Sequence, residues 1–170
     1  MKTTLKLVLA IAIIAVCSNV SAQTQKMAHI NLDELIVAMP EYDSAMVKMQ
    51  KFKNDLTDVL DGMNTDRNKL YEEYTTKSKD WTEIVKKSKE EAINSLGARI
   101  QQFQERAVEE VENEQNKLFQ PIIEKANKAI ADVAKEQGVT YVISANSLLY
   151  KATGTLDLLQ DVKKKMGITK

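Results

Sequence analysis

Few side chains in this sequence could make or break covalent bonds. The chain contains one histidine, His29, and its single cysteine is Cys17, so the sets of histidine and cysteine ligands that hold zinc are missing. Four glutamates between positions 109 and 114 form a charge run on a predicted helix, and such a run is usually a solvated face. The sequence has no glycine-rich loop of the phosphate-binding type. It therefore predicts a protein that is not an enzyme and that uses no cofactor or metal.

Methionine and aromatic side chains offer a different chemistry, which is contact with varied apolar surfaces. Flexible thioethers and amphipathic aromatic rings adapt to partners of different shape. Met49 and Met63 fall in a helical repeat and are expected in a core, which leaves Tyr42 and Met46 as candidate contacts. Trp81 is a third candidate, because it stands in a segment with exposed-type neighbours.

The segment around Trp81 is also rich in lysine. Five lysines surround it: Lys77, Lys79, Lys86, Lys87 and Lys89. Two interpretations remain open. The lysines could form a basic surface that contacts anionic partners or lipid headgroups, or they could pair locally with Asp80 and Glu83 and aid solubility.

Two helical repeats must position these side chains. The first runs from Asp43 to about Thr76, and its apolar residues recur in steps of three and four: Met49, Phe52, Leu56, Val59, Met63 and Leu70. The second repeat follows the same steps: Ile93, Leu96, Ile100, Phe103 and Ala107. Stripes this narrow are typical of coiled coils rather than of helices that lie on a globular core.

The two repeats predict an antiparallel hairpin. Pairing Phe52 with Ala107 and Leu56 with Phe103 places the reversal near residues 79 and 80. Asp80 and Glu83 have the spacing of a capping box, which independently predicts a helix start there. Gly62 and Gly97 fall at one level of this hairpin, so they mark either a bend, a close approach of the backbones or two unrelated tolerated glycines.

Segments from both ends of the chain are predicted to form strands and short helices outside the helical hairpin. Residues 26–31 are a strand candidate, and a short helix follows that ends before Pro40. Pro121 marks the junction at which the returning helix leaves the arm, and Gly138 is suited to end it. Residues 139–144 and 148–153 read as two strands of a hairpin, and a last helix follows from about residue 156.

These elements predict an α+β fold with two parts. The body comprises residues 23–42 and 121–170, and the arm comprises residues 43–120 with its tip near 76–83. Three short strands make a weak sheet with exposed edges, which oligomerisation would cover. The expected interface positions are apolar: Ile30, Val142, Ile143, Leu148 and Leu149.

The N-terminus predicts export. Lys2 and Lys6 flank an apolar run that is followed by small residues ending at Ala22, which is the pattern of a secretory signal peptide. We expect residues 1–22 to be cleaved before Gln23. The whole chain has 24 basic and 24 acidic residues, so the mature chain would carry a net charge of about −2, which gives no electrostatic attraction to nucleic acid.

The stretch NKLFQPIIEKANKAIADVAKEQGVTYVISANSLLYK, from Asn116 to Lys151, together with the first strand and the long heptad hairpin, resembles the Skp/OmpH family of periplasmic chaperones. The resemblance covers essentially the whole mature chain. It implies a periplasmic homotrimer with a central β-body and three helical arms around a cavity. It also implies an ATP-independent holdase that keeps unfolded outer-membrane proteins soluble.

The chain departs from this family in two respects. Members often have an Asp-Ile-Thr-like turn before the last helix, whereas here Asp157 is followed by Leu158 and Leu159. The best-known members are also strongly basic, and this chain is not. The alternative function is a coiled-coil tether or spacer in the cell envelope, which would require a retained N-terminal anchor.

Overall fold

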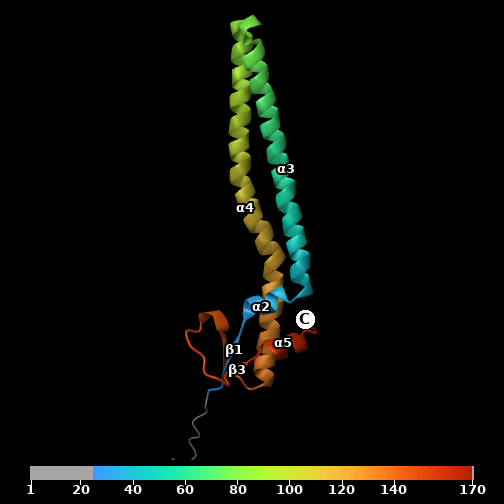
Figure 1. The fold of residues 1–170 in the computed structure, drawn as a ribbon, viewed down its shortest axis with the longest axis vertical. Helices are drawn as coiled ribbons and strands as arrows, with labels where there is room; N and C mark the ends of the chain where they lie inside the picture. The colour runs from blue at the N-terminus through green and yellow to red at the C-terminus, as the bar shows by residue number, and fades with distance from the viewer. Residues whose placement is uncertain (1–24, 170) are drawn as a thin grey trace, which may run out of the picture.

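The computed structural model describes residues 25–169, so the predicted signal peptide lies outside the described residues. A small body lies at one end and a long helical arm projects from it (Figure 1). The elements follow one another in this order: β1 Met27–Ile30, α2 Leu32–Val37, α3 Pro40–Lys77, η1 Ser78–Asp80, α4 Glu83–Glu136, β2 Tyr141–Ser144, η2 Ala145–Ser147, β3 Leu156–Asp157 and α5 Leu159–Lys165.

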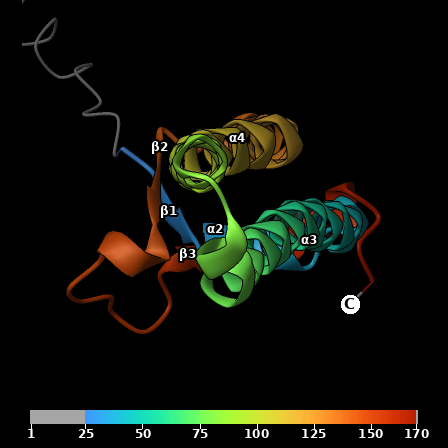
Figure 2. The ribbon, with the colours of Figure 1, turned by 90° about the horizontal axis from the view of Figure 1, so that it is seen from above.

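The arm is an antiparallel pair of long helices. α3 and α4 run side by side and are joined at the tip by the 3-10 turn η1 (Figures 1 and 2). The 38 residues of α3 correspond to about 57 Å of helix at 1.5 Å per residue. The α+β fold class and the reversal near residues 79 and 80 are therefore confirmed.

The helix seam differs from the predicted repeat at one position. Val59 was expected between the helices, but it is 50% exposed, and Leu60 is half-buried in its place. A strict seven-residue repeat faces a partner only if the helices supercoil, because a straight α-helix has 3.6 residues per turn and drifts away from it. Leu60 takes the place of Val59 only at this level, because the seam continues at Met63 as predicted.

The helix ends also differ from the predictions. α3 begins at Pro40 rather than at Asp43, since proline in the first turn lacks only a donor that would be unpaired there anyway. The predicted capping box is wrong, because Asp80 belongs to η1 and Thr82 is the N-cap of α4 without a side-chain hydrogen bond. α4 continues through Pro121, so the arm and the body share one helix.

The sheet joins both ends of the chain but not as predicted. Its order is β2-β1-β3, and both outer strands are parallel to β1. Ala28 is opposite Val142 on one side and Leu156 on the other. The predicted hairpin of 139–144 and 148–153 is therefore wrong, and the third strand is Leu156–Asp157.

Parallel pairing explains this correction. Two strands that both run parallel to β1 need a crossover connection rather than a tight turn. Residues 145–155 form that connection, and they project sideways from the helices (Figures 1 and 2). The apolar run at 148–150 lies in this crossover and not in a strand.

The body core lies where the strands meet α2, α5 and the end of α4. Its most enclosed side chains belong to Leu35, Met39, Leu158 and Val162. Gly138 follows the C-cap of α4 with φ 65°, a left-handed conformation that glycine adopts without steric cost. The prediction that Gly138 ends this helix is confirmed.

Candidate functional site

The structure brings two of the three predicted contact residues together at the base of the arm. The ring of Tyr42 on α3 meets that of Phe119 on α4 edge-to-face, with the centroids 5.7 Å apart at an interplanar angle of 63°. Met46 lies one turn further along α3 and is 46% exposed. A pocket of about 290 Å³ opens beside them, lined by Tyr42, Met46, Met49, Gln50, Lys53, Gln115 and Phe119.

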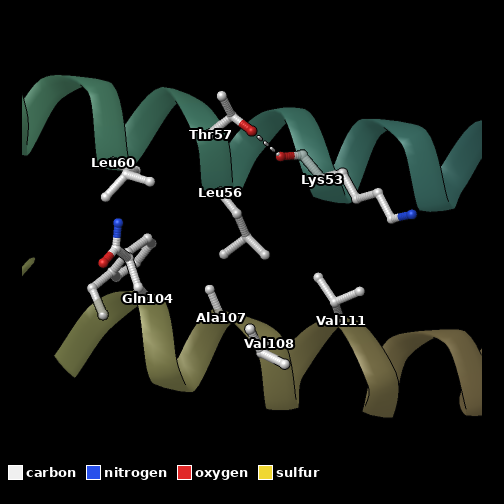
Figure 3. Close-up of a pocket in the computed structure, with 9 residues that line it drawn as sticks. Lys53, Leu56, Thr57, Leu60, Gln104, Ala107, Val108 and Val111 are labelled. Atoms are coloured by element: carbon white, nitrogen blue, oxygen red, sulfur yellow. Dashed lines mark hydrogen bonds between the residues drawn. The ribbon is translucent and has the colours of Figure 1, made fainter. Parts of the chain in front are cut away.

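A larger apolar pocket continues along the arm. It measures about 560 Å³ and is lined by Lys53, Leu56, Thr57, Leu60, Phe103, Gln104, Ala107, Val108 and Val111. In Figure 3 the side chains of Leu56 and Leu60 point from α3 toward α4, where Ala107 and Val111 point back. Because Ala107 has only a methyl group opposite Leu56, the two helices leave space between them at this level.

The two pockets form one surface, because Lys53 lines both. We call the residues of both pockets the arm groove. Lys53 is the only charged residue in it, whereas the pocket beside Leu118 and Pro121 contains Glu41, Lys48 and Lys125. The arm therefore has one groove with a single charged residue, and a separate pocket with three charged residues where the arm meets the body.

Charges at the base of the arm link its two helices. Lys125 on α4 donates a hydrogen bond to the Glu41 carboxylate on α3. This hydrogen bond holds the pKa of Glu41 below its usual value, because it favours the ionised carboxylate.

Trp81 lies at the tip, at the opposite end of the arm from Tyr42. Its ring packs edge-to-face on Tyr74 with the centroids 5.9 Å apart, and the Lys89 amine lies 5.6 Å from the Trp81 ring. The Tyr74 hydroxyl donates to Glu90, and this bond raises the pKa of Tyr74 because it stabilises the protonated phenol. Trp81 is thus half-buried within the tip itself.

The lysines of the tip are partly paired within the chain. Lys77 and Lys89 lie 4.0 Å and 3.0 Å from Glu73, and Lys86 lies 2.7 Å from Glu83. These ion pairs favour the interpretation of local charge pairing. Apolar side chains are nevertheless exposed beside them, with Ile84 at 79%.

The predicted interface residues occupy different environments. Ile30 is only 3% exposed within the single chain, so its side chain is already covered by the body core. Val142, Ile143 and Leu148 are half-buried, and Leu149 is fully exposed. β2 is an outer strand of the sheet, so one of its edges is free in the single chain.

Sequence reasoning missed several exposed apolar residues. Tyr150 is 82% exposed beside Leu149 on the crossover, and Val108 is 72% exposed in the arm groove. Val108 had a usable signal, because it is an apolar residue outside the predicted seam that directly follows the small seam residue Ala107. Phe119 was also missed, and it follows Leu118, another residue that packs against the core.

His29 has structural partners rather than a catalytic environment. Its ring is buried, Nδ1 donates to the Leu156 carbonyl oxygen at 2.8 Å, and Nε2 lies 3.1 Å from the Lys151 amine. Asp157 lies 3.5 Å from Nε2. These contacts tie β1 to β3 and to the crossover.

Between residues 25 and 169, no helix is both long and apolar enough to cross a membrane. In the same residues, no group of three or more histidine, cysteine, aspartate or glutamate side chains is placed to hold a metal ion.

Comparison with known proteins identifies the family. The family model of OmpH-like outer membrane proteins matches residues 26–166, which is most of the chain, so this protein belongs to the OmpH-like family. A solved structure with a similar fold is that of the OmpH-like protein of Caulobacter crescentus CB15, a candidate outer membrane chaperone. The two share 10% sequence identity with a TM-score of 0.73, and the match covers 86% of each chain. No curated protein matches the sequence.

Proposed function

We propose that this protein is an ATP-independent holdase that binds unfolded outer-membrane proteins in the periplasm and prevents their aggregation. The observation that carries the proposal is the arm groove, which keeps apolar side chains accessible along a water-exposed helical arm. Membership of the OmpH-like family and the fold shared with a candidate outer membrane chaperone support it.

The physical basis of capture is burial of apolar surface. Each Å² of apolar surface removed from water is worth about 25 cal/mol, so a client segment is held without any energy input. Met46 suits such a surface because it is exposed and its flexible thioether fits side chains of different shapes. Release follows when the client folds and covers its own apolar residues.

The proposal includes a homotrimer built through the body. The free edge of β2 and the exposed Leu149 and Tyr150 on the crossover support it, because unpaired strand edges and clustered apolar residues are covered in stable assemblies. Three arms from one base would surround a client on several sides.

The location follows from the predicted signal peptide. Cleavage before Gln23 would release the mature chain into the periplasm, where unfolded outer-membrane proteins are in transit. N-terminal sequencing of the mature protein tests this step, and a retained residue 1 would favour the envelope tether instead. A membrane-surface contact at the arm tip is a further part of the proposal, supported by the exposed Ile84 beside the lysines.

An aggregation assay tests the proposed function. An unfolded outer-membrane barrel protein is diluted from denaturant with the mature chain in the absence of ATP, and light scattering is followed. We expect the chain to suppress scattering at a stoichiometric ratio. Scattering equal to that of a control with an inert protein would reject the holdase function.

A further inference from the structure

We propose that the arm groove binds one extended segment of a client, in which apolar and polar side chains alternate, and holds its apolar face. The inference rests on the proposed holdase function and deepens it, because it names the segment that is recognised and the surface that recognises it.

The first argument is the apolar lining of the arm groove. The groove is lined mainly by leucine, valine, methionine and aromatic side chains, and Val108 and Met46 on its walls are exposed. A strand of a membrane-spanning barrel alternates apolar and polar residues, so when extended it presents every apolar side chain on one side. Such a segment would bury its apolar side in the groove and leave its polar side in water.

The second argument is length. From Tyr42 to Leu60 the groove follows α3 for about 27 Å at 1.5 Å per residue. An extended chain of about eight residues spans the same distance at about 3.3 Å per residue. Strands of membrane barrels have about 9–11 residues, so one strand segment matches one groove.

The third argument is charge. Lys53 lies where the two pockets meet, and no carboxylate lines either pocket. The salt bridges of residues 25–169 do not include Lys53. The groove therefore favours a segment with a carboxylate near its centre. Because Lys53 is exposed, we expect this carboxylate to improve binding only about two- to fivefold.

Peptide binding to the full mature chain tests the inference. The probe is a fluorescent ten-residue peptide in which leucine or valine alternates with threonine and one central position is glutamate. A second peptide has the same composition with its apolar residues in one block. Fluorescence anisotropy should give at least tenfold tighter binding of the alternating peptide. Replacing its glutamate by glutamine should weaken binding about two- to fivefold in the wild type and not in Lys53→Gln.

Two valines provide a matched pair of variants. Val108→Asp places a charge on the wall of the groove, whereas Val59→Asp changes an exposed valine on the same arm that does not line it. We expect Val108→Asp to weaken binding of the alternating peptide at least tenfold and Val59→Asp less than twofold. Equal effects of the two variants would overturn the inference.

A substitution that fills the groove with an apolar side chain tests the inference without destabilising the arm. Ala107→Leu adds an apolar side chain to the space opposite Leu56. We expect it to weaken peptide binding at least fivefold while the melting temperature of the arm stays equal or rises. Unchanged binding would overturn the inference, and so would a change in oligomeric state, because the groove would then hold a second copy of this chain.

The outcome is separable from that of the proposed function. If the wild type, Val108→Asp and Ala107→Leu all suppress aggregation of an unfolded barrel equally, the holdase function stands and the groove inference fails. If the wild type does not suppress aggregation, the holdase function itself fails, whatever the peptide does. Competition by myristate with no preference for the alternating peptide would assign the groove to lipid chains and overturn the inference.

Discussion

At the scale of single residues, the pocket at the base of the arm combines Tyr42 and Met46 from α3 with Phe119 from α4. The sequence alone was enough to select Tyr42 and Met46 as candidate contacts, because aromatic rings and flexible thioethers suit varied apolar partners. The sequence did not show that Phe119 and Val108 lie in the same groove. This depends on which residues of α4 lie opposite Tyr42 and Leu56 of α3. That alignment is set by the geometry of the tip and by small residues such as Ala107.

The ion pair between Glu41 and Lys125 leads to a prediction about pH. Its hydrogen bond lowers the pKa of Glu41 in the folded state, so its stabilisation is present above the unfolded pKa of about 4.3 and is lost as the pH falls through the folded value. Both side chains are substantially exposed, so the contribution is at most about 1 kcal/mol.

We therefore expect Glu41→Gln to lower the free energy of unfolding by a few tenths to about 1 kcal/mol at pH 7, and by less at pH 3. Urea unfolding at the two pH values measures this. Glu112→Gln removes an exposed carboxylate from the same hairpin and serves as the control. A difference for Glu41→Gln that is as large at pH 3 as at pH 7 would show that the carboxylate does not act through its charge.

At the scale of elements, the arm was easier to predict than the body. Helix repeats are local, so their seams could be read directly, apart from the exchange of Val59 for Leu60. The sheet depends on strands that are more than a hundred residues apart, and an apolar run such as that at 148–150 looks the same in a strand and in an exposed crossover. Only the parallel pairing with β1 decides between the two.

Gly62 and Gly97 provide a test of arm rigidity. A Cβ atom on either glycine would meet nothing within 4 Å, so close approach of the backbones does not explain them. We expect the double replacement by alanine to raise the free energy of unfolding by about 1 to 2 kcal/mol, because glycine is the poorer helix former.

Hydrogen exchange in residues 58–66 and 93–101 would show whether the glycines also permit bending. Slower exchange there after the double replacement would support a flexible level, and unchanged exchange would make them tolerated residues. Gly138→Ala is the contrasting control, since Gly138 has φ 65° and alanine there should destabilise the chain by about 1 kcal/mol.

At the scale of the whole molecule, the proposed trimer depends on the body. Leu149 is fully exposed on the crossover, so Leu149→Asp should dissociate the assembly without unfolding the single chain. Sedimentation equilibrium at micromolar concentration measures this. Val47→Asp is the control, because Val47 is 70% exposed on the arm. A wild-type monomer would contradict the proposed trimer, and an intact Leu149→Asp trimer would exclude this surface as its interface.

Client binding by the whole molecule should depend little on salt. The expected net charge of the mature chain is about −2, and exposed charges are screened beyond about 8 Å at physiological ionic strength, whereas apolar burial is largely insensitive to moderate salt. Affinity for an unfolded barrel protein should therefore change by less than about threefold between low and physiological salt. Tyr42→Ala with Met46→Ala should weaken binding.

Neutralising Lys86, Lys87 and Lys89 is the matched comparison and should have little effect on client affinity. Fluorescence titration of a labelled, unfolded barrel protein would measure all of these variants. A steep loss of affinity with added salt, or a large effect of the lysine changes alone, would place client capture at the tip.

The position of β1 at the centre of the sheet also determines the order in which the molecule can fold. β1 is synthesised before the other strands and helices of the structure, but both strands that flank it belong to the last thirty residues. The helical hairpin needs only its own neighbouring residues and can form while the chain is still emerging, whereas contacts between distant residues form slowly. The body therefore closes last, and each newly made chain has a finished arm before its sheet is complete.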